Sequence, residues 1–388
     1  MAVSTPRRAV GWALLAVASA GLVSCTGGSS PASTDVSIAV TRGECGPTWS
    51  AHGGARTFHI KNSGTVTDEI DLIAPSNGGI YAEVESLAPN TSRSMHLTLA
   101  RGTYAFRCYG EDTDGVTGPT VTVTDGPAHG TPAVQPVDDE TLTGAVTQYR
   151  SRVTAGLTLL ATDVDKLRQA LRGGDPATAR SAWLTAHLDY ERLGAAYGTF
   201  DDFADKIDGM PDGLPGGVHD PDFTGLRRIE YGLWHGEALS SVATVADQLA
   251  TDVAGLRKAF PDQQVDPNDL PLRAHEIMEN ALQFELTGEA DQGSGTGMAT
   301  IDANLDGTQM VLDAVAPVMK TRYAGWNQVA TWMSRTRTAV DAARRPDGTW
   351  TPISALDQAQ RERLDGDIGQ LLETLAPIAA IGDVRRTS

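Results

Sequence analysis

Residues 142–171 of the chain read LTGAVTQYRSRVTAGLTLLATDVDKLRQAL. Apolar side chains recur in this stretch at steps of three and four, namely at Leu142, Val146, Tyr149, Val153, Leu157, Leu160, Val164, Leu167 and Leu171. Such spacing places them along one side of a helix. It predicts one long amphipathic helix that ends near Gly173 and Gly174.

The chain keeps this helical period up to its C-terminus. Further helices are predicted at residues 177–197, from residue 224 onward, and at 241–260, 272–286, 308–343 and 354–381. Ser354 and Asp357 are spaced much like a capping box at the start of the last one. Short connections between long helices indicate an antiparallel bundle over residues 138–388. An acidic loop at residues 209–222 interrupts it, and loops of that length often carry function.

Residues 35–125 have the pattern of strands instead. Short β-branched and aromatic runs alternate with turn residues such as Arg101 and Gly102. These runs are residues 36–40, 57–60, 95–99, 103–106 and 121–123. They predict a small β-sandwich, followed by a proline-rich extended linker at residues 126–137. The expected fold therefore has two domains, an all-β sandwich and an all-α helix bundle.

The first 25 residues have the features of a targeting segment. Arg7 and Arg8 precede an apolar run over residues 10–23, which ends in Leu-Val-Ser-Cys at Cys25. This ending is typical of a bacterial lipoprotein signal, although an ordinary signal peptide with an incidental cysteine is the alternative. We expect a lipidated Cys25 that holds the protein on the outer face of a membrane, with residues 26–34 as a flexible tether.

Two cysteines, Cys45 and Cys108, remain in the β-rich region. In an oxidising extracytoplasmic compartment such a pair most simply forms a disulfide, and metal ligation is the alternative.

The composition favours cationic partners. Lysine and arginine number 31 against 49 aspartates and glutamates, which gives a formal charge of −18. Nucleic acid binding needs clustered basic residues, so a nucleic acid partner is not expected. No stretch beyond the N-terminus approaches the roughly 18 apolar residues of a membrane span, so the chain is not predicted to be a transporter by itself.

Two histidines each precede a glutamate by four residues, His187 with Glu191 and His275 with Glu279. Positions four apart share one face of a helix. Four aspartates crowd the end of the helix that carries Glu191, and Glu230 lies on another predicted helix; these aspartates are Asp201, Asp202, Asp205 and Asp208. Converging carboxylates suit a hard cation. The alternative is that they are solvated carboxylates of an acidic protein.

Four segments resemble a known family in their order and spacing: AHLDYERL at residues 186–193, residues 200–208, DFTGLRRIEYGLW at 222–234 and TGEAD at 287–291. The resemblance is to the imelysin-like helical domain of EfeO-type iron-uptake proteins. The region around Cys45, residues 99–104 and Cys108 is similar to the cupredoxin-like N-terminal domain of the same proteins. The resemblance implies an extracytoplasmic iron-binding component that works beside a membrane iron permease and a haem peroxidase.

The family's metal site uses a Gly-x-His-x-x-Glu motif, and this chain departs from it. Gly225 and Glu230 are kept, but Arg227 stands where the histidine belongs. A permanently protonated guanidinium has no lone pair for a metal. Two hypotheses follow. In the first, a metal ion, iron or alternatively zinc or copper, binds a rebuilt site. In the second, Arg227 replaces the cation and pairs with Glu230. The rebuilt site would use Glu191, Asp205, Glu230 and Glu279, with help from His187 or His275.

The sequence also bears on other sites and activities. A blue-copper centre needs histidine and methionine near its cysteine, and neither follows Cys108 closely, so none is expected. A weak oxygen-ligand site in the β-domain, or solvent-facing carboxylates, would involve Glu69, Asp71, Glu83, Glu85, Glu111 and Asp112. A lipid-anchored scaffold without metal is one alternative function. A metal-dependent peptidase is another, but the zincin-like segment at residues 275–279 lacks the second imidazole.

Replacing Cys25 by alanine tests the lipoprotein signal. We expect the Cys25→Ala chain to be unprocessed or soluble on cell fractionation, because the acylated thiol would be absent. A cleaved Cys25→Ala chain that still needs detergent for release from the membrane would contradict this.

Overall fold

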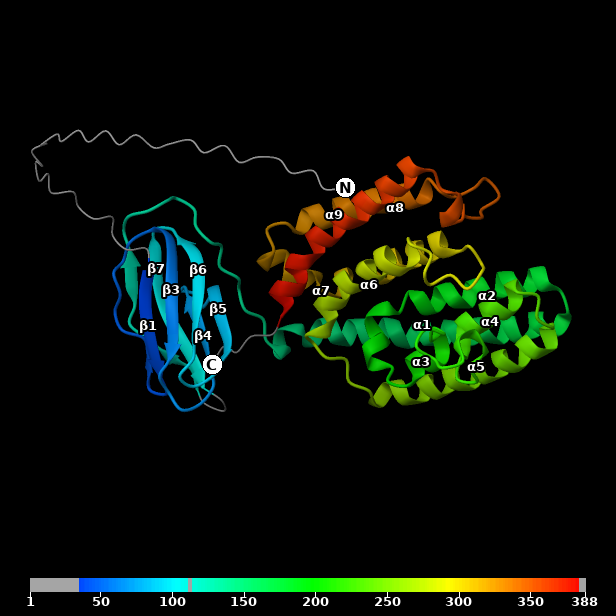
Figure 1. Ribbon diagram of the computed structural model, residues 1–388, viewed down its shortest axis with the longest axis horizontal. Helices are drawn as coiled ribbons and strands as arrows, with labels where there is room; N and C mark the ends of the chain where they lie inside the picture. Colours follow the sequence, from blue (N-terminus) through cyan, green and yellow to red (C-terminus); the bar gives the residue numbers. More distant parts are fainter. Residues whose placement is uncertain (1–34, 111–113, 384–388) are drawn as a thin grey trace, which may run out of the picture.

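The computed structural model describes residues 35–110 and 114–383. The predicted signal segment, Cys25 and the tether lie outside the described residues, as do Glu111 and Asp112. A β-sandwich is followed by a helical domain, which confirms the expected two-domain fold (Figure 1). Within the described part, no helix has both the length and the apolar character that crossing a membrane requires.

The β-sandwich consists of two sheets. The first has the order β2-β1-β3-β6, in which β1 and β3 are parallel, and the second has the order β5-β4-β7-β8, with β9 paired to β7. The strands are β1 (Asp35–Thr41), β2 (Glu44–Cys45), β3 (Gly54–Asn62), β4 (Asp68–Ile73), β5 (Ile80–Leu87), β6 (Ser92–Leu99), β7 (Gly102–Gly110), β8 (Val116–Thr117) and β9 (Val121–Val123). A disulfide joins Cys45 of β2 to Cys108 of β7, with a Cα–Cα distance of 5.5 Å.

Four strands were not predicted from the sequence: β2, β4, β5 and β8. The longer two, β4 and β5, carry acidic residues that interrupt the apolar alternation on which strand prediction depends. Asp71 of β4 is fully buried opposite Arg107 of β7, with 3.9 Å between the charged groups. Asp71 therefore does not face solvent, contrary to one alternative for the acidic residues of this domain.

The helical domain contains long helices and short helical turns. The long helices are α1 (Asp139–Gly173), α2 (Pro176–Glu191), α4 (Gly225–Trp234), α5 (Leu239–Ala259), α6 (Asp269–Asn280), α7 (Gly297–Arg322), α8 (Trp326–Asp341) and α9 (Gln358–Gly382). The shorter ones are α3 (Phe203–Asp208), the 3-10 turns η1 (Gly194–Thr199), η2 (Gly217–His219), η3 (Phe260–Asp262) and η5 (Ile353–Ala355), and the π-helix η4 (Ala281–Glu285).

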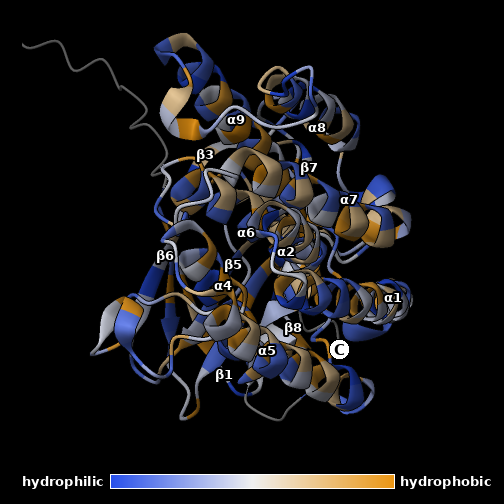
Figure 2. Ribbon diagram, turned by 90° about the vertical axis from the view of Figure 1, so that its right-hand side faces the viewer, coloured by the Kyte–Doolittle hydropathy of each residue, from blue (hydrophilic) through white to orange (hydrophobic). Residues whose placement is uncertain are grey.

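The helices form two contacting groups. The first group consists of α1, α2, α4 and α5, and the second of α6, α7, α8 and α9. Helix α7 joins the groups, because it also contacts α1 and α2. Helix α2 consequently lies in the middle of the domain (Figure 2). The predicted apolar stripe of α1 is buried, apart from the partly buried Val146. Burial of this stripe is the main reason why α1 forms one uninterrupted helix.

Three details of the helix prediction were wrong. Residues 308–343 were expected to form one helix, but α7 ends at Arg322, Tyr323 is extended, and α8 begins at Trp326. Helix α7 also begins earlier than predicted. Its first turns bury small residues, which give a weak hydrophobic pattern: Gly297, Ala299, Ala303 and Gly307. The capping box of α9 is formed by Asp357 with Gln360, not by Ser354 with Asp357.

Gly225 allows α4 to begin directly against the end of α3. Its φ is +76°, in the left-handed region that favours glycine. A Cβ at this position would lie 2.3 Å from the carbonyl oxygen of Ile207, so no side chain fits without a backbone shift. The close approach places Arg227 beside Asp208, the last residue of α3.

Replacing Gly225 by alanine tests this constraint. We expect Gly225→Ala to lower the free energy of unfolding by about 2 kcal/mol or more, because strained backbone and a steric clash add together. Gly144→Ala is the matched control. Gly144 lies within α1 with open space around it, so alanine there should be neutral or stabilising by about 1 kcal/mol. Equal denaturation midpoints for the two variants would contradict the prediction.

Candidate metal site

Helix α2 carries the first two residues of the site. Asp175 caps it by accepting hydrogen bonds from Ala177 N and Thr178 N, and Pro176 occupies its first turn. His187 and Glu191 then lie on one face, one turn apart. His187 is completely buried, and its ring stacks on Trp183 with 5.0 Å between centroids and 6° between planes.

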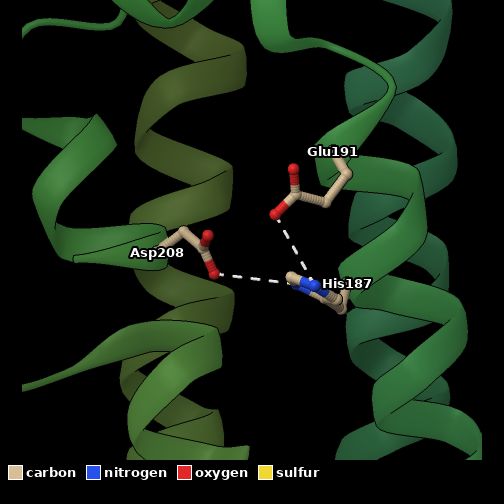
Figure 3. A group of neighbouring side chains, drawn as sticks. All are labelled: His187, Glu191 and Asp208. Atoms are coloured by element: carbon tan, nitrogen blue, oxygen red, sulfur yellow. Dashed lines mark ion pairs between the residues drawn. The ribbon is translucent and has the colours of Figure 1, made fainter. Parts of the chain in front are cut away.

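Three side chains converge where α2 meets the end of α3: His187, Glu191 and Asp208 (Figure 3). His187 Nε2 lies 3.5 Å from Glu191 Oε1, and His187 Nδ1 lies 3.7 Å from Asp208 Oδ1. Thr300 Oγ1 is 3.3 Å from Nε2. Neither His187 Nδ1 nor Asp208 Oδ1 has a hydrogen-bond partner among the described residues. One nitrogen and two carboxylates in this arrangement are suitable ligands for a metal ion.

The guanidinium of Arg227, on α4, lies beside these three residues and is buried. It reaches four carboxylates, which we call the carboxylate cluster: Glu191, Asp208, Glu230 and Glu285. It makes four hydrogen bonds and one longer ion pair: Nε to Asp208 Oδ2 (3.2 Å), Nη1 to Ala290 O (3.2 Å) and Glu230 Oε2 (3.9 Å), and Nη2 to Glu191 Oε1 (3.0 Å) and Glu285 Oε1 (3.1 Å).

Glu230 is fixed by the loop that leads into α7. Its Oε1 accepts hydrogen bonds from Gln292 N at 3.0 Å, Ser294 N at 3.2 Å and Ser294 Oγ at 2.6 Å. Asp291 shapes this loop by accepting from Gly293 N and Gly295 N. Glu230 Oε2, in contrast, has no hydrogen-bond partner among the described residues and faces Arg227.

The cluster contains more negative than positive charge. Burial raises the pKa of Glu191 well above its ordinary value; Arg227 lowers it, and Asp208 raises it again. Burial likewise raises the pKa of Glu230 to about 8, against the lowering effect of Arg227. Burial lowers the pKa of Arg227, but attraction to the carboxylates outweighs this and keeps that pKa well above its ordinary value. One guanidinium cannot neutralise four carboxylates, so the cluster needs protons or another cation.

The structure brings together only part of the predicted ligand set. His187, Glu191 and Glu230 lie around Arg227, whereas the other three predicted ligands lie elsewhere. Asp205 is exposed one turn before Asp208. The side chain of Glu279 is 43% exposed, accepts a hydrogen bond from Gln283 and lies 3.7 Å from His275 Nδ1.

Asp208 and Glu285 replace Asp205 and Glu279 in the observed cluster. Asp208 was one of the four aspartates noted in the sequence but was not chosen as a ligand. Glu285 was missed because it ends the π-helix η4, whose wider turn breaks the α-helical period that linked His275 to Glu279. The sequence signal that could have identified Glu285 is its position two residues before the TGEAD segment.

A cleft of about 1130 Å³ opens beside the cluster and reaches Asp208 and Tyr190. The predicted acidic loop contributes residues 209–210, 212–214 and 222 to its wall. Lys206 is the one basic residue among the described residues that line it. Besides Asp208, five acidic residues line the cleft, and we therefore call it the acidic cleft: Asp202, Asp205, Asp212, Asp222 and Asp252. A cleft of one charge sign raises the local concentration of the opposite ion.

Arg227 forms an ion pair with Glu230, as one of the two hypotheses expected, and it also contacts three other carboxylates. Its shortest carboxylate contact is with Glu191, and Glu230 is the most distant of the four. Asp208 lies between the guanidinium and His187, since its Oδ2 faces Arg227 and its Oδ1 faces His187. Glu191 Oε1 likewise lies near both Arg227 Nη2 and His187 Nε2.

Comparisons with known proteins agree with this architecture. The family model described as Imelysin (Peptidase M75) matches residues 145–378. A protein named iron uptake system component EfeO from Escherichia coli O157:H7 is 28% identical over 348 residues, which cover 89% of this chain and 91% of that protein. The protein of the same name from Escherichia coli K12 is 27% identical over the same shares.

A solved structure from Parabacteroides distasonis, named as an iron-regulated protein A precursor, is also similar in fold. It has a TM-score of 0.50 and 11% sequence identity, and the match covers 64% of this chain and 98% of that chain. The family model accounts for more than half of the residues, and the EfeO relatives extend the similarity into the β-sandwich. The chain therefore belongs to the imelysin family, in the two-domain form of EfeO-type proteins.

Proposed function

We propose that this chain is the extracytoplasmic cation-capturing component of an iron uptake system, with the ion as its cargo. The iron-uptake names of its relatives support a role in such a system, and the geometry of the site supports a metal ion as the cargo. The ion would be held by His187, Glu191 and Asp208 and would enter through the acidic cleft. Cys25 would anchor the protein to the membrane, and a membrane permease and a haem peroxidase would be its partners.

One observation carries the proposal: two facing atoms lack hydrogen-bond partners in a buried site that contains four carboxyl groups and one guanidinium. His187 Nδ1 and Asp208 Oδ1 are 3.7 Å apart, and neither has a hydrogen-bond partner among the described residues. Either a proton on Nδ1 or a cation has to lie between these two atoms, because two facing lone pairs would repel each other. A ferrous or zinc ion would remove this repulsion, because both accept imidazole and carboxylate ligands.

The second candidate function is a scaffold without metal. The hydrogen bonds of Arg227 to three carboxylates favour it, since they already supply a positive charge to the cluster. The two candidates differ in one measurable property, the affinity for metal ions.

Metal titration of the purified protein tests the proposal. We expect calorimetric binding of ferrous or zinc ion, and a loss of at least about tenfold in affinity in His187→Gln and in Asp208→Asn, because each removes one ligand. The matched control is His275→Gln, which removes the predicted histidine that lies outside the cluster. Its affinity should remain within about twofold of wild type.

Thermal unfolding of each variant would verify that it is folded. Absence of binding of ferrous, ferric and zinc ions by the wild-type protein would refute the proposed function and favour the scaffold. A loss in His275→Gln equal to that in His187→Gln would show that the ion binds elsewhere.

The affinity should also depend on pH. The raised pKa values of Glu191 and Glu230 mean that the folded protein holds protons that an ion must displace. The affinity for zinc should therefore rise with pH, by up to about tenfold per unit for each proton released, and the step that Glu230 contributes should fall near pH 8. Calorimetry in buffers with different ionisation enthalpies would count the protons.

Glu230→Gln is the control for this pH dependence, because glutamine has a similar size and does not titrate. The zinc affinity of Glu230→Gln should therefore lack the pH-dependent step near pH 8. An affinity that stays constant from pH 5 to 8, or a Glu230→Gln profile identical to that of wild type, would contradict the assignment.

A further inference from the structure

We infer, resting on the proposed function, that Arg227 is a built-in counter-cation: it assembles the carboxylate cluster when no ion is bound and competes with the incoming ion for Glu191. Arg227 is thus a positioning residue that sets how tightly the ion is held. It contacts the ligands of the ion rather than the ion itself.

The hydrogen bonds of the guanidinium show how it assembles the cluster. Its donors join the end of α2 through Glu191, the end of α3 through Asp208, and η4 through Glu285. These residues come from segments far apart in the sequence, and their like charges repel. A central cation reduces this repulsion, and Arg227 supplies one without a metal.

The same geometry makes the competition specific to Glu191. Glu191 Oε1 accepts a hydrogen bond from Arg227 Nη2 at 3.0 Å and also lies 3.5 Å from His187 Nε2. An ion bound beside His187 has to share this oxygen with the guanidinium. Asp208 presents no such conflict, because Oδ2 binds Arg227 while Oδ1 points toward His187.

Arg227 has anchors that would hold it in place when Glu191 turns to the ion. Nη1 donates to the Ala290 carbonyl at 3.2 Å, and Nη2 also donates to Glu285 at 3.1 Å. The guanidinium therefore stays near the bound ion, and its positive charge weakens binding by repulsion. A site of this kind is already assembled when empty and releases its ion easily, as suits a protein that carries a cargo.

Variants of Arg227 test the inference in the purified full-length protein. We expect Arg227→Gln and Arg227→His to bind zinc and ferrous ions about tenfold or more tightly than wild type, because the competing charge is removed. Arg227→Lys keeps the charge and should bind within about threefold of wild type. Arg228→Gln is the matched control, since Arg228 pairs with Glu237 instead of the cluster and should bind as wild type does.

The effect of zinc on thermal unfolding separates this role from a purely structural one. In chelator, Arg227→Gln should unfold roughly 10 °C below wild type, because four carboxylates lose their cation. Saturating zinc should raise its Tm by more than it raises that of wild type. If Arg227→Gln does not fold in chelator, recovery of folding on addition of zinc supports the inference, and failure to fold at any zinc concentration contradicts it.

Two results overturn the inference while leaving the proposed function intact. One is that the wild type binds metal ions and that Arg227→Gln and Arg227→His bind them with the same affinity. The other is a loss of stability in Arg227→Gln that zinc corrects no better than in wild type. Absence of binding in the wild type and in every Arg227 variant overturns both the inference and the proposed function.

Discussion

The helical domain is organised around a buried positive charge among negative ones. Arg227 forms hydrogen bonds with Glu191, Asp208 and Glu285, and the four side chains come from four separate segments. Charges removed from water are costly unless they are paired and hydrogen-bonded, so each of these segments has to end at a defined place. Gly225 permits the close approach of α3 and α4, and the π-helix η4 turns its last residue toward the guanidinium.

The arrangement of helices explains why the cluster lies where it does. Helix α2 contacts α1, α4 and α7, and its last turns carry His187 and Glu191 into the middle of the domain. The stack of His187 on Trp183 fixes the ring, and Trp183 is itself held by a hydrogen bond from Nε1 to the carbonyl of Leu226. The acidic cleft then connects this interior to solvent through Asp208. The proposed ion route and the proposed ligand set thus share one residue.

The departure at position 227 gives the site a character of its own. A histidine there would add a neutral ligand, whereas arginine adds a permanent charge with five N–H donors. The rest of the site is compatible with this charge, because four carboxylates exceed what one guanidinium can balance. Under the proposed function, the arginine changes how strongly a cation is held within the imelysin architecture.

The sequence alone determined the two domains, most helices and the candidate histidine, because apolar periodicity and helical spacing are local properties. The sequence also identified Arg227 as a departure from the motif. The tertiary structure decided which carboxylates meet: Asp208 rather than Asp205, and Glu285 rather than Glu279. Side-chain direction at a helix end and the extra residue of a π-helix turn depend on packing between distant segments, which no local period encodes.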